Sequence, residues 1–319
     1  MSTVKEAAEQ LVTQVGRVVV GKGEAVEQLF AALLVDGHVL LNDVPGVGKT
    51  TLARAVARSL DLDFSRVQCT PDLVPSDITG VSIYDQREGR FEYRPGPLMA
   101  NVVLVDEINR ATPRAQSSLL EAMQERQVTV DDTTHTLPDP FFVIATQNPI
   151  ELEGTFPLPE AQLDRFLFLL ELGYPTEEGE DEMLRLHGAA TVDTGTLAPL
   201  FGRQALGEFR EAVRGIRVGE PVRRYIGAIA RATRGLQGVE LGASPRASIA
   251  LFRASQARAA IHGRAYVLPD DVKRQAPAVL RHRLFLDADA QMCGRTPAAI
   301  VAEVLGRVPV PAEEPRPVA

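Results

Sequence analysis

The stretch from residue 41 to residue 51 reads Leu-Asn-Asp-Val-Pro-Gly-Val-Gly-Lys-Thr-Thr, and it constrains the fold more than any other part of the chain. It follows an apolar run and leads into a run typical of a helix. A strand, a glycine-rich turn and a helix N-terminus in this order form a phosphate cradle, because backbone N–H groups and the helix dipole converge on one point. We therefore expect a nucleotide-binding α/β fold with a parallel sheet.

The residues of this loop have distinct expected roles. Gly46 and Gly48 let the backbone pass close to phosphates, Lys49 can reach the β- and γ-phosphates, and the Thr50 hydroxyl can ligate Mg²⁺. Asp43 stands where the P-loop pattern begins with Gly, and a chance glycine turn is the alternative interpretation at this point. The predicted phosphate contacts are Pro45, Gly46, Val47, Gly48, Lys49, Thr50 and Thr51.

A second motif, Val-Val-Leu-Val-Asp-Glu-Ile-Asn-Arg, occupies residues 102–110. Four aliphatic residues in a row predict a strand buried on both faces, and ligands of open α/β sheets bind at the carboxyl ends of such strands. Asp106 is then placed to hold Mg²⁺, and Glu107 to orient and deprotonate a water. The alternative is a pair of acids that caps the next turn.

A third strand-like run, residues 141–146, is followed by Gln147-Asn148-Pro149. A polar amide at the end of a buried strand could position the attacking water beside the γ-phosphate. Asn148 taken alone would indicate ordinary turn chemistry before a proline. The two preceding motifs favour the functional interpretation.

With these motifs in order, the chain resembles the MoxR family of AAA+ ATPases over about residues 20–286. The differences are Lys22 and Cys69, where the pattern leads us to expect Gln and Phe, and they touch no phosphate chemistry. Members of the family often carry an acid in place of the first P-loop Gly. Further matching segments are residues 70–80, 121–129, 145–149 and 157–166.

The resemblance implies roles for residues that spacing alone would not single out. Arg165 matches the arginine finger that acts on ATP bound to the neighbouring subunit, although from sequence it could simply pair with Asp164. Arg246 matches sensor 2, and Ser244-Pro245 before it predicts an N-cap and a first helical position; a solvated Arg is the alternative. Val20 and Gly21 match the segment that packs near the adenine.

The resemblance and the pattern together predict the domain organisation. Residues 1–173 form the α/β core with a parallel five-stranded sheet, 174–220 a connecting helical segment, 221–308 a small all-α lid, and 309–319 a disordered proline-rich tail. Hairpin inserts are expected at about 80–95 (the helix 2 insert) and 127–140 (the pre-sensor 1 hairpin). In related assemblies both face the pore or the substrate; the alternative is that each only covers the sheet edge.

The amino-acid composition argues against several classes of partner and cellular location. The net charge of −8 and the absence of Trp argue against nucleic acid. Two cysteines fit a reducing compartment and give neither a disulfide framework nor a zinc site. No secretory signal is visible at the N-terminus, and no apolar stretch is long enough to span a bilayer. We therefore expect a cytoplasmic protein without membrane insertion.

The expected function is that of an ATP- and Mg²⁺-dependent motor or chaperone. By the resemblance it forms a ring homo-oligomer, a hexamer, and acts on protein clients associated with von Willebrand factor A domains. Two alternatives remain open from the sequence: an assembly scaffold controlled by ATP, against which the intact Glu107 argues, and a DNA-associated AAA+ motor, against which the acidic balance argues.

Overall fold

The computed structural model describes residues 3–149, 154–189 and 194–311. The chain divides into two compact units, Met1–Arg210 and Glu211–Ala319, and each is described by itself. The domain limits expected at residues 173, 220 and 308 stay predictions. Most of the proline-rich tail, residues 312–319, lies outside the described residues.

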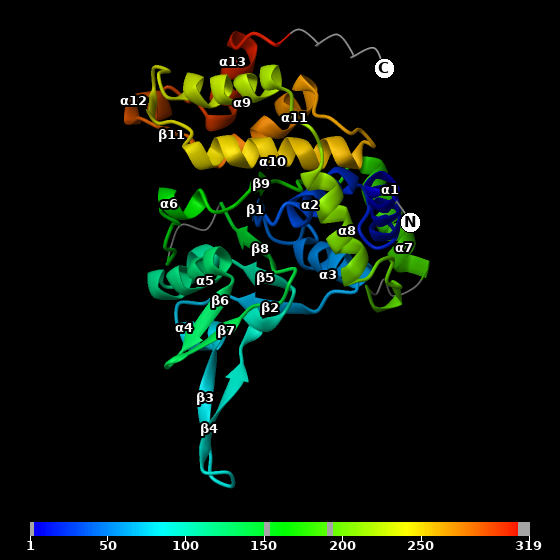
Figure 1. Ribbon diagram of the computed structural model, residues 1–319, viewed down its shortest axis with the longest axis vertical. Helices are drawn as coiled ribbons and strands as arrows, with labels where there is room; N and C mark the ends of the chain where they lie inside the picture. Colours follow the sequence, from blue (N-terminus) through cyan, green and yellow to red (C-terminus); the bar gives the residue numbers. More distant parts are fainter. Residues whose placement is uncertain (1–2, 150–153, 190–193, 312–319) are drawn as a thin grey trace. The chain divides into compact units, whose positions relative to one another are not determined.

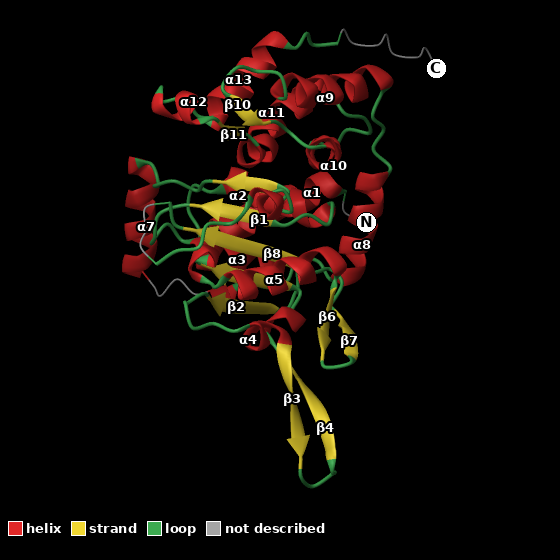
Figure 2. Ribbon diagram, turned by 90° about the vertical axis from the view of Figure 1, so that its left-hand side faces the viewer, coloured by secondary structure: helices red, strands yellow, loops and turns green. Residues whose placement is uncertain are grey.

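A five-stranded parallel sheet forms the centre of the first unit, with strand order β2-β5-β8-β1-β9. This confirms the predicted α/β core. Figure 2 shows the arrowheads of these strands pointing to one edge of the sheet, so residues that follow them gather there. The strands are β1 (Val39–Asn42), β2 (Phe64–Gln68), β5 (Val102–Asp106), β8 (Phe142–Gln147) and β9 (Phe168–Leu170).

Both faces of the central strands β5 and β8 are buried, which explains their unbroken aliphatic runs. Val103, Val105 and Val143 belong to a core cluster with Leu119 and Leu120 of α5 (Pro113–Glu125). Their alternating neighbours on β5 and β8 are fully buried as well, and α3 (Lys49–Ser59) packs near β5 and β2. The other helices of this unit, drawn in Figure 1, are α1 (Val4–Gly16), α2 (Gly23–Leu34), α4 (Pro75–Thr79), η1 (Pro97–Met99), η2 (Ile108–Arg110), α6 (Glu160–Leu163), α7 (Glu177–Ala189) and η3 (Thr194–Thr196), with α8 (Arg203–Arg214) crossing into the second unit.

Two antiparallel hairpins interrupt the alternation of strands and helices. They are β3–β4 (Gly80–Asp85 and Arg90–Pro95) and β6–β7 (Gln127–Val130 and Thr133–Thr136). Tyr93 of β4 stacks on His135 of β7 with ring centroids 3.8 Å apart, so the two hairpins touch. The β3–β4 hairpin projects away from the sheet (Figure 2).

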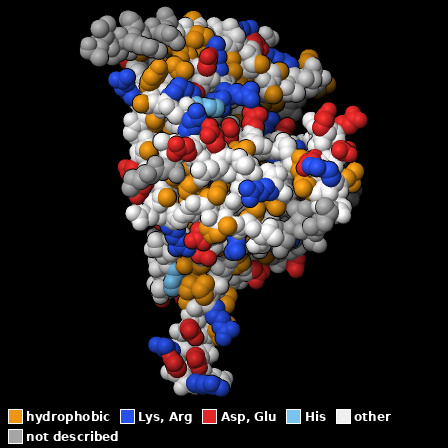
Figure 3. All heavy atoms as spheres, turned by 90° about the vertical axis from the view of Figure 1, so that its right-hand side faces the viewer, with side chains coloured by type: hydrophobic (Ala, Val, Ile, Leu, Met, Phe, Trp, Pro, Cys, Tyr) orange, Lys and Arg blue, Asp and Glu red, His pale blue; other side chains and the backbone are white. Residues whose placement is uncertain are grey.

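The outer half of the β3–β4 hairpin is not covered by the rest of the described chain. Tyr84 and Phe91 pair edge-to-face there, and Phe91 is 71% exposed. Charged side chains gather toward the projecting end (Figure 3), where Arg90 and Glu88 form an ion pair of 2.5 Å. A hairpin that only covered the sheet edge would bury its aromatic side chains.

The second unit is helical, as predicted, with one addition. β10 (Val239–Leu241) and β11 (Phe285–Leu286) form a short antiparallel pair that the sequence pattern does not indicate. Ser244 caps α10 and Pro245 is its first residue, so the predicted helix start is confirmed. The helices are α9 (Glu220–Thr233), α10 (Pro245–Ile261), α11 (Pro269–Leu280), η4 (Arg281–Arg283), α12 (Ala288–Met292) and α13 (Pro297–Arg307).

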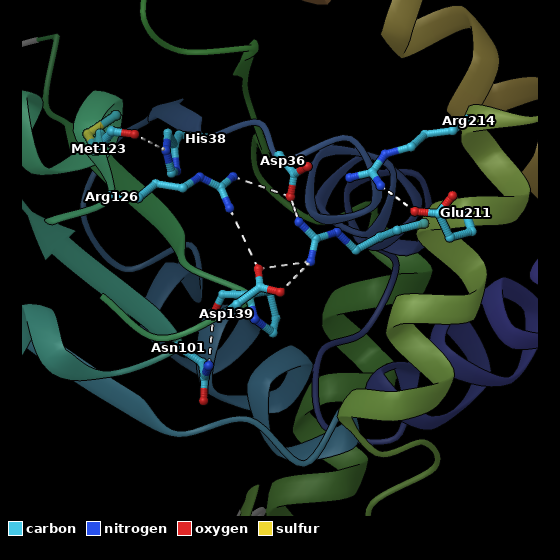
Figure 4. A network of polar contacts seen from close by, with 10 residues as sticks. Asp36, His38, Asn101, Met123, Arg126, Asp139, Glu211 and Arg214 are labelled. Atoms are coloured by element: carbon cyan, nitrogen blue, oxygen red, sulfur yellow. Dashed lines mark hydrogen bonds and ion pairs between the residues drawn. The ribbon is translucent and has the colours of Figure 1, made fainter. Parts of the chain in front are cut away.

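A buried histidine and a charge network lie where the chain enters β1 and β8, at the amino-terminal ends of these strands (Figure 4). His38 Nδ1 accepts a hydrogen bond from the N–H of Val143 at 3.1 Å, so Nε2 carries the proton and donates to the Met123 carbonyl at 3.2 Å. Burial lowers the pKa of His38 to about 4; the Met123 hydrogen bond opposes this, and the charge of Arg126 adds to it. The folded protein therefore holds a neutral imidazole with a fixed tautomer.

Four charged side chains surround this region and neutralise one another. Arg126 lies 3.2 Å from Asp36 and 3.6 Å from Asp139. Arg210 of α8 contacts both acids as well, at 2.9 Å from Asp139. The network joins α8 to the turn after α2 and to the end of α5, within the first unit.

We expect His38 to make the first unit sensitive to acid. The unfolded chain takes up a proton near pH 6.5, whereas the folded imidazole resists protonation down to about pH 4. Stability is therefore complete above pH 6.5 and is lost as the pH falls toward 4, by about 3 kcal/mol in total. Urea unfolding should show the stability difference between wild type and His38→Gln shrinking by that amount from pH 7 to pH 4.

The matched control is His135→Gln, which removes a half-buried imidazole from the hairpin instead. A stability difference between wild type and His38→Gln that did not change with pH would contradict the assignment of a neutral buried imidazole.

Candidate active site

The loop between β1 and α3 has the backbone that a phosphate cradle needs. Gly46 and Gly48 have φ of +85° and +87°, which L side chains rarely adopt. A Cβ built on either would meet no atom within 4 Å. The loop is thus open where phosphate oxygens would approach, and its residues fit a nucleotide.

Lys49 is the first residue of α3 and lies over this loop. Its Nζ donates to the carbonyl oxygens of Asp43 at 2.7 Å and Val44 at 3.1 Å. Burial lowers the pKa of Lys49, and the charges of Asp43, Asp106 and Glu107 oppose that shift. Three acids therefore favour the charged ammonium at the position where the sequence predicts a phosphate contact.

Asp43 and Lys22 have structural roles that explain why they depart from the expected pattern. The Asp43 carboxylate accepts hydrogen bonds from the N–H groups of Leu172 and Gly173, the latter at 3.2 Å. Lys22 donates to the carbonyls of the same segment, at 2.7 Å for Leu172, 2.9 Å for Gly173 and 3.3 Å for Tyr174. Asp43 thus binds the N–H groups of the segment after β9, and Lys22 binds its carbonyl groups.

This segment leads to α7, which lies near the predicted adenine contacts. A Cβ on Gly179 would stand 4.0 Å from Cγ1 of Val20. Gly21, next to Val20, has φ of +72° with open space around it. The contact of Val20 and Gly21 with adenine stays a prediction. These residues directly precede Lys22, which with Asp43 fixes the segment after β9.

The three predicted motifs meet at the carboxyl edge of the sheet. The N–H of Asp43 donates to the Gln147 carbonyl at 3.1 Å, which places the P-loop beside the end of β8 and hence beside Asn148. Asn148 is buried. The N–H of Glu107 donates to Thr146 Oγ1 at 2.9 Å, which ties the acid pair to the same strand.

Asp106 and Thr50, the two predicted Mg²⁺ ligands, lie side by side. Thr50 Oγ1 lies 3.5 Å from Asp106 Oδ2, and Thr146 Oγ1 donates to Asp106 Oδ1 at 3.2 Å. A carboxylate and a hydroxyl oxygen are hard donors of the kind that Mg²⁺ takes beside phosphate oxygens and waters. The residues present fit the ion.

Glu107 has a left-handed backbone, with φ of +57° and ψ of +50°. A non-glycine residue in this region is uncommon and costs on the order of 1 kcal/mol, and such strain gathers at functional sites. Its carboxylate Oε2 accepts from Gln68 at 3.0 Å and from Arg110 at 3.1 Å. The structure thus turns Glu107 out of the strand and holds its side chain.

Three polar residues at this site escaped the sequence analysis. Arg66 and Gln68 are on the edge strand β2, whose register sets Gln68 opposite Asp106. Arg66 Nε donates to Asp106 Oδ2 at 2.7 Å, and its NH2 donates to Gln68 at 2.8 Å. Arg110 forms the ion pair with Glu107. The alternation of polar side chains at 66 and 68 is the only sequence signal, and it does not reveal which strand lies next to β2.

Arg165 and Arg246 lie in different units. Arg165 follows α6, and its NH1 donates to the carbonyl of Leu120 in α5 at 2.6 Å. Its Nε is buried and has no hydrogen-bond partner within the described residues. Arg246 is exposed in the first turn of α10. The finger and sensor roles stay predictions.

Cys69, which follows β2, is a buried free thiol. Burial raises the pKa of its thiol to about 12, and the charges of Asp106 and Glu107 add to this. The thiol therefore stays protonated. Across residues 3–149, 154–189 and 194–311, no group of three or more His, Cys, Asp and Glu side chains is arranged to hold a metal, and no helix has both the length and the apolar character to cross a membrane.

Comparison with known proteins agrees with this architecture. Residues 38–168 match the ATPase family associated with various cellular activities (AAA), and residues 231–304 match the AAA lid domain. The chain is 51% identical to the uncharacterised protein YeaC of Bacillus subtilis, with 95% of this chain and 94% of that protein covered. It is 43% identical to chaperone MoxR1 of Mycobacterium tuberculosis, with 95% and 82% covered.

Two further matches extend the comparison. Protein MoxR of Methylorubrum extorquens is 32% identical, with 90% of each chain covered. The crystal structure of a candidate ATPase from Cytophaga hutchinsonii superimposes with a TM-score of 0.91 at 39% identity, over 97% of this chain and 96% of that one. The likeness thus extends through both units of the chain.

Proposed function

The chain belongs to the MoxR family of AAA+ ATPases, and on that premise we propose that it hydrolyses ATP at subunit interfaces to remodel or mature client proteins. ATPase activity itself follows from the family and from the likeness to an ATPase structure. The observation that carries the proposal is the meeting of the open loop, Asp106 and Glu107 at one edge of the sheet.

The chain's own residues divide the chemistry among them. The N–H groups of the loop and Lys49 bind and orient the phosphates. Thr50 and Asp106 would hold Mg²⁺, which when bound would neutralise charge on the phosphate oxygens. Glu107 orients a water and accepts its proton, for which its left-handed backbone and its contacts with Gln68 and Arg110 position the carboxylate.

Asn148 and Arg246 are proposed to sense the state of the nucleotide. Asn148→Ala and Arg246→Ala should both slow hydrolysis while leaving the fold intact. Arg246→Ala should also weaken nucleotide affinity, because a hydrogen bond from a charged group to phosphate is worth about 1.5–3 kcal/mol. Turnover assays and titration with a fluorescent ATP analogue measure the two effects.

Arg253, a second arginine of α10, provides the matched control. Arg253→Ala should bind and hydrolyse ATP as wild type does. If Arg246→Ala also left affinity and rate unchanged, sensor 2 would have to be removed from the mechanism.

The proposed clients are proteins, in particular those with von Willebrand factor A domains, as the family resemblance implies. One relative is named a chaperone. The exposed aromatic pair on the projecting β3–β4 hairpin supports a protein-facing role. A ring homo-oligomer, a hexamer by resemblance, and a cytoplasmic location belong to the same proposal, the latter testable by cell fractionation.

The test is affinity capture from the native cell with Glu107→Gln plus ATP, because a variant that binds but does not hydrolyse ATP should retain its client. Lys49→Ala captured under the same conditions is the control. Proteins enriched only with Glu107→Gln support remodelling, and identical protein sets from the two variants contradict it.

Two other functions were open from the sequence. In an assembly scaffold, ATP would drive ring formation without steady turnover, so multiple turnovers per subunit exclude it. A DNA-associated motor would bind DNA with strong salt dependence. The net charge of −8 argues against a DNA-associated motor.

A further inference from the structure

The oxygen of Asp106 that faces the predicted metal already has a cationic partner within the chain. Asp106 Oδ2 is the oxygen near Thr50 Oγ1, at 3.5 Å, and it is also the oxygen that Arg66 Nε contacts at 2.7 Å. The other oxygen, Oδ1, is taken by Thr146. A cation shared by Thr50 and Asp106 would therefore need the oxygen that Arg66 holds.

The burial of the two partners is unequal. The Asp106 side chain is 9% exposed, whereas the Arg66 side chain is 47% exposed. A buried carboxylate without a cation is costly, so Arg66 stabilises the site before metal arrives. Because Arg66 lies on an edge strand and is half in solvent, its guanidinium can leave Asp106 and become hydrated at small cost.

We propose that Arg66 is an internal competitor of Mg²⁺ for Asp106 and thereby sets the Mg²⁺ concentration at which the protein binds nucleotide tightly. This inference rests on the proposed magnesium site at Thr50 and Asp106. Two cations cannot share one carboxylate oxygen without repulsion, so each bound Mg²⁺ displaces Arg66 or weakens its contact. Arg66 is thus a positioning residue that lowers apparent metal affinity and protects the metal-free site.

The test replaces Arg66 by Met, which keeps a long side chain and removes the charge. A fluorescent ADP analogue is titrated at a series of free Mg²⁺ concentrations and in EDTA. The free Mg²⁺ concentration that gives half of the Mg²⁺-dependent gain in affinity for the ADP analogue should fall about fivefold in Arg66→Met. This is the effect expected from losing a half-exposed charge pair worth about 1 kcal/mol. Affinity in EDTA should not rise, because the gain needs the metal. Arg66→Lys should stay close to wild type.

Arg54→Met is the matched control. Arg54 belongs to α3, and its guanidinium lies 5.6 Å from the ring centroid of Phe64 on β2, the strand that carries Arg66. Replacing Arg54 therefore removes an equal charge near the same strand. Its half-maximal Mg²⁺ should match wild type. Thermal unfolding gives a second readout: Mg²⁺ with ADP should raise the unfolding temperature of Arg66→Met more than that of wild type.

The outcomes separate this inference from the proposed function. If wild type binds nucleotide equally with Mg²⁺ and in EDTA, the magnesium site itself fails. If wild type depends on Mg²⁺ and Arg66→Met shows the same half-maximal concentration within twofold, or a higher one, only the competition is overturned. Arg66→Gln serves as the second neutral variant if Arg66→Met does not fold.

Discussion

Glu107→Gln is expected to bind ATP as wild type does and to hydrolyse it at least ~100-fold more slowly, the usual size of a general-base contribution. The amide cannot accept a proton from water, yet it has nearly the shape of the carboxylate. The backbone of Glu107 is fixed by Thr146 and its own left-handed conformation, so the substitution should not move the chain. Phosphate release measures turnover, and a fluorescent ATP analogue measures binding.

Glu121→Gln is the matched control, because Glu121 is an exposed acid of α5. Its turnover should stay within about twofold of wild type, because a surface substitution away from the site usually changes stability by only about 0.5 kcal/mol. Equal hydrolysis by wild type and Glu107→Gln would remove Glu107 from the catalytic mechanism, whatever its geometry.

The sequence identified the parts of the site that depend on local chemistry. The glycines of the loop, the aliphatic run before Asp106 and the cap at Ser244 are each readable from a few consecutive residues. The carboxyl ends of parallel strands meet at one edge, so the strand pattern alone is enough to bring the three motifs together.

The parts that sequence could not supply depend on long-range contacts. Asp43 departs from the P-loop pattern, and its partners are backbone groups about 130 residues later, at Leu172 and Gly173. Arg66 reaches Asp106 only because β2 lies beside β5. The register between two strands is set by packing and does not appear in either strand alone.

Helix patterning in the second unit shows a similar limit. The spacing of Ile249, Phe252 and Ala260 predicts that they share one face of the helix after Pro245. Ile249 is 57% exposed, and Leu251, Ala254 and Ala257 are fully buried. α10 is rich in Ala and packs against both α9 and α11, so its core side is lined mainly by Ala together with Leu251, and a large apolar side chain does not by itself identify that side.

The largest expected effect concerns assembly and starts from Arg165. Its NH1 donates to the Leu120 carbonyl of α5, and its Nε is buried with no hydrogen-bond partner within the described residues. If Arg165 acts on the neighbour's nucleotide, Arg165→Ala should bind ATP normally and lose on the order of 10³–10⁵ in rate. Lys49→Ala should lose nucleotide binding, because the phosphates lose the cation of the loop.

Mixing the two inactive variants is the decisive measurement. A subunit with Arg165→Ala keeps an intact loop, and a Lys49→Ala neighbour keeps an intact Arg165, so about a quarter of the interfaces are complete in an equal mixture of head-to-tail rings. Turnover should rise toward that fraction of wild type after mixing, while each variant alone stays inactive. Wild-type turnover per subunit should also fall on dilution as the ring dissociates.

Sizing with ATP verifies that the variants co-assemble. Mixed rings without recovered turnover, or a chain that stays monomeric with ATP and hydrolyses it at a rate independent of protein concentration, would contradict a finger in trans, because neither result is possible if every site needs two subunits.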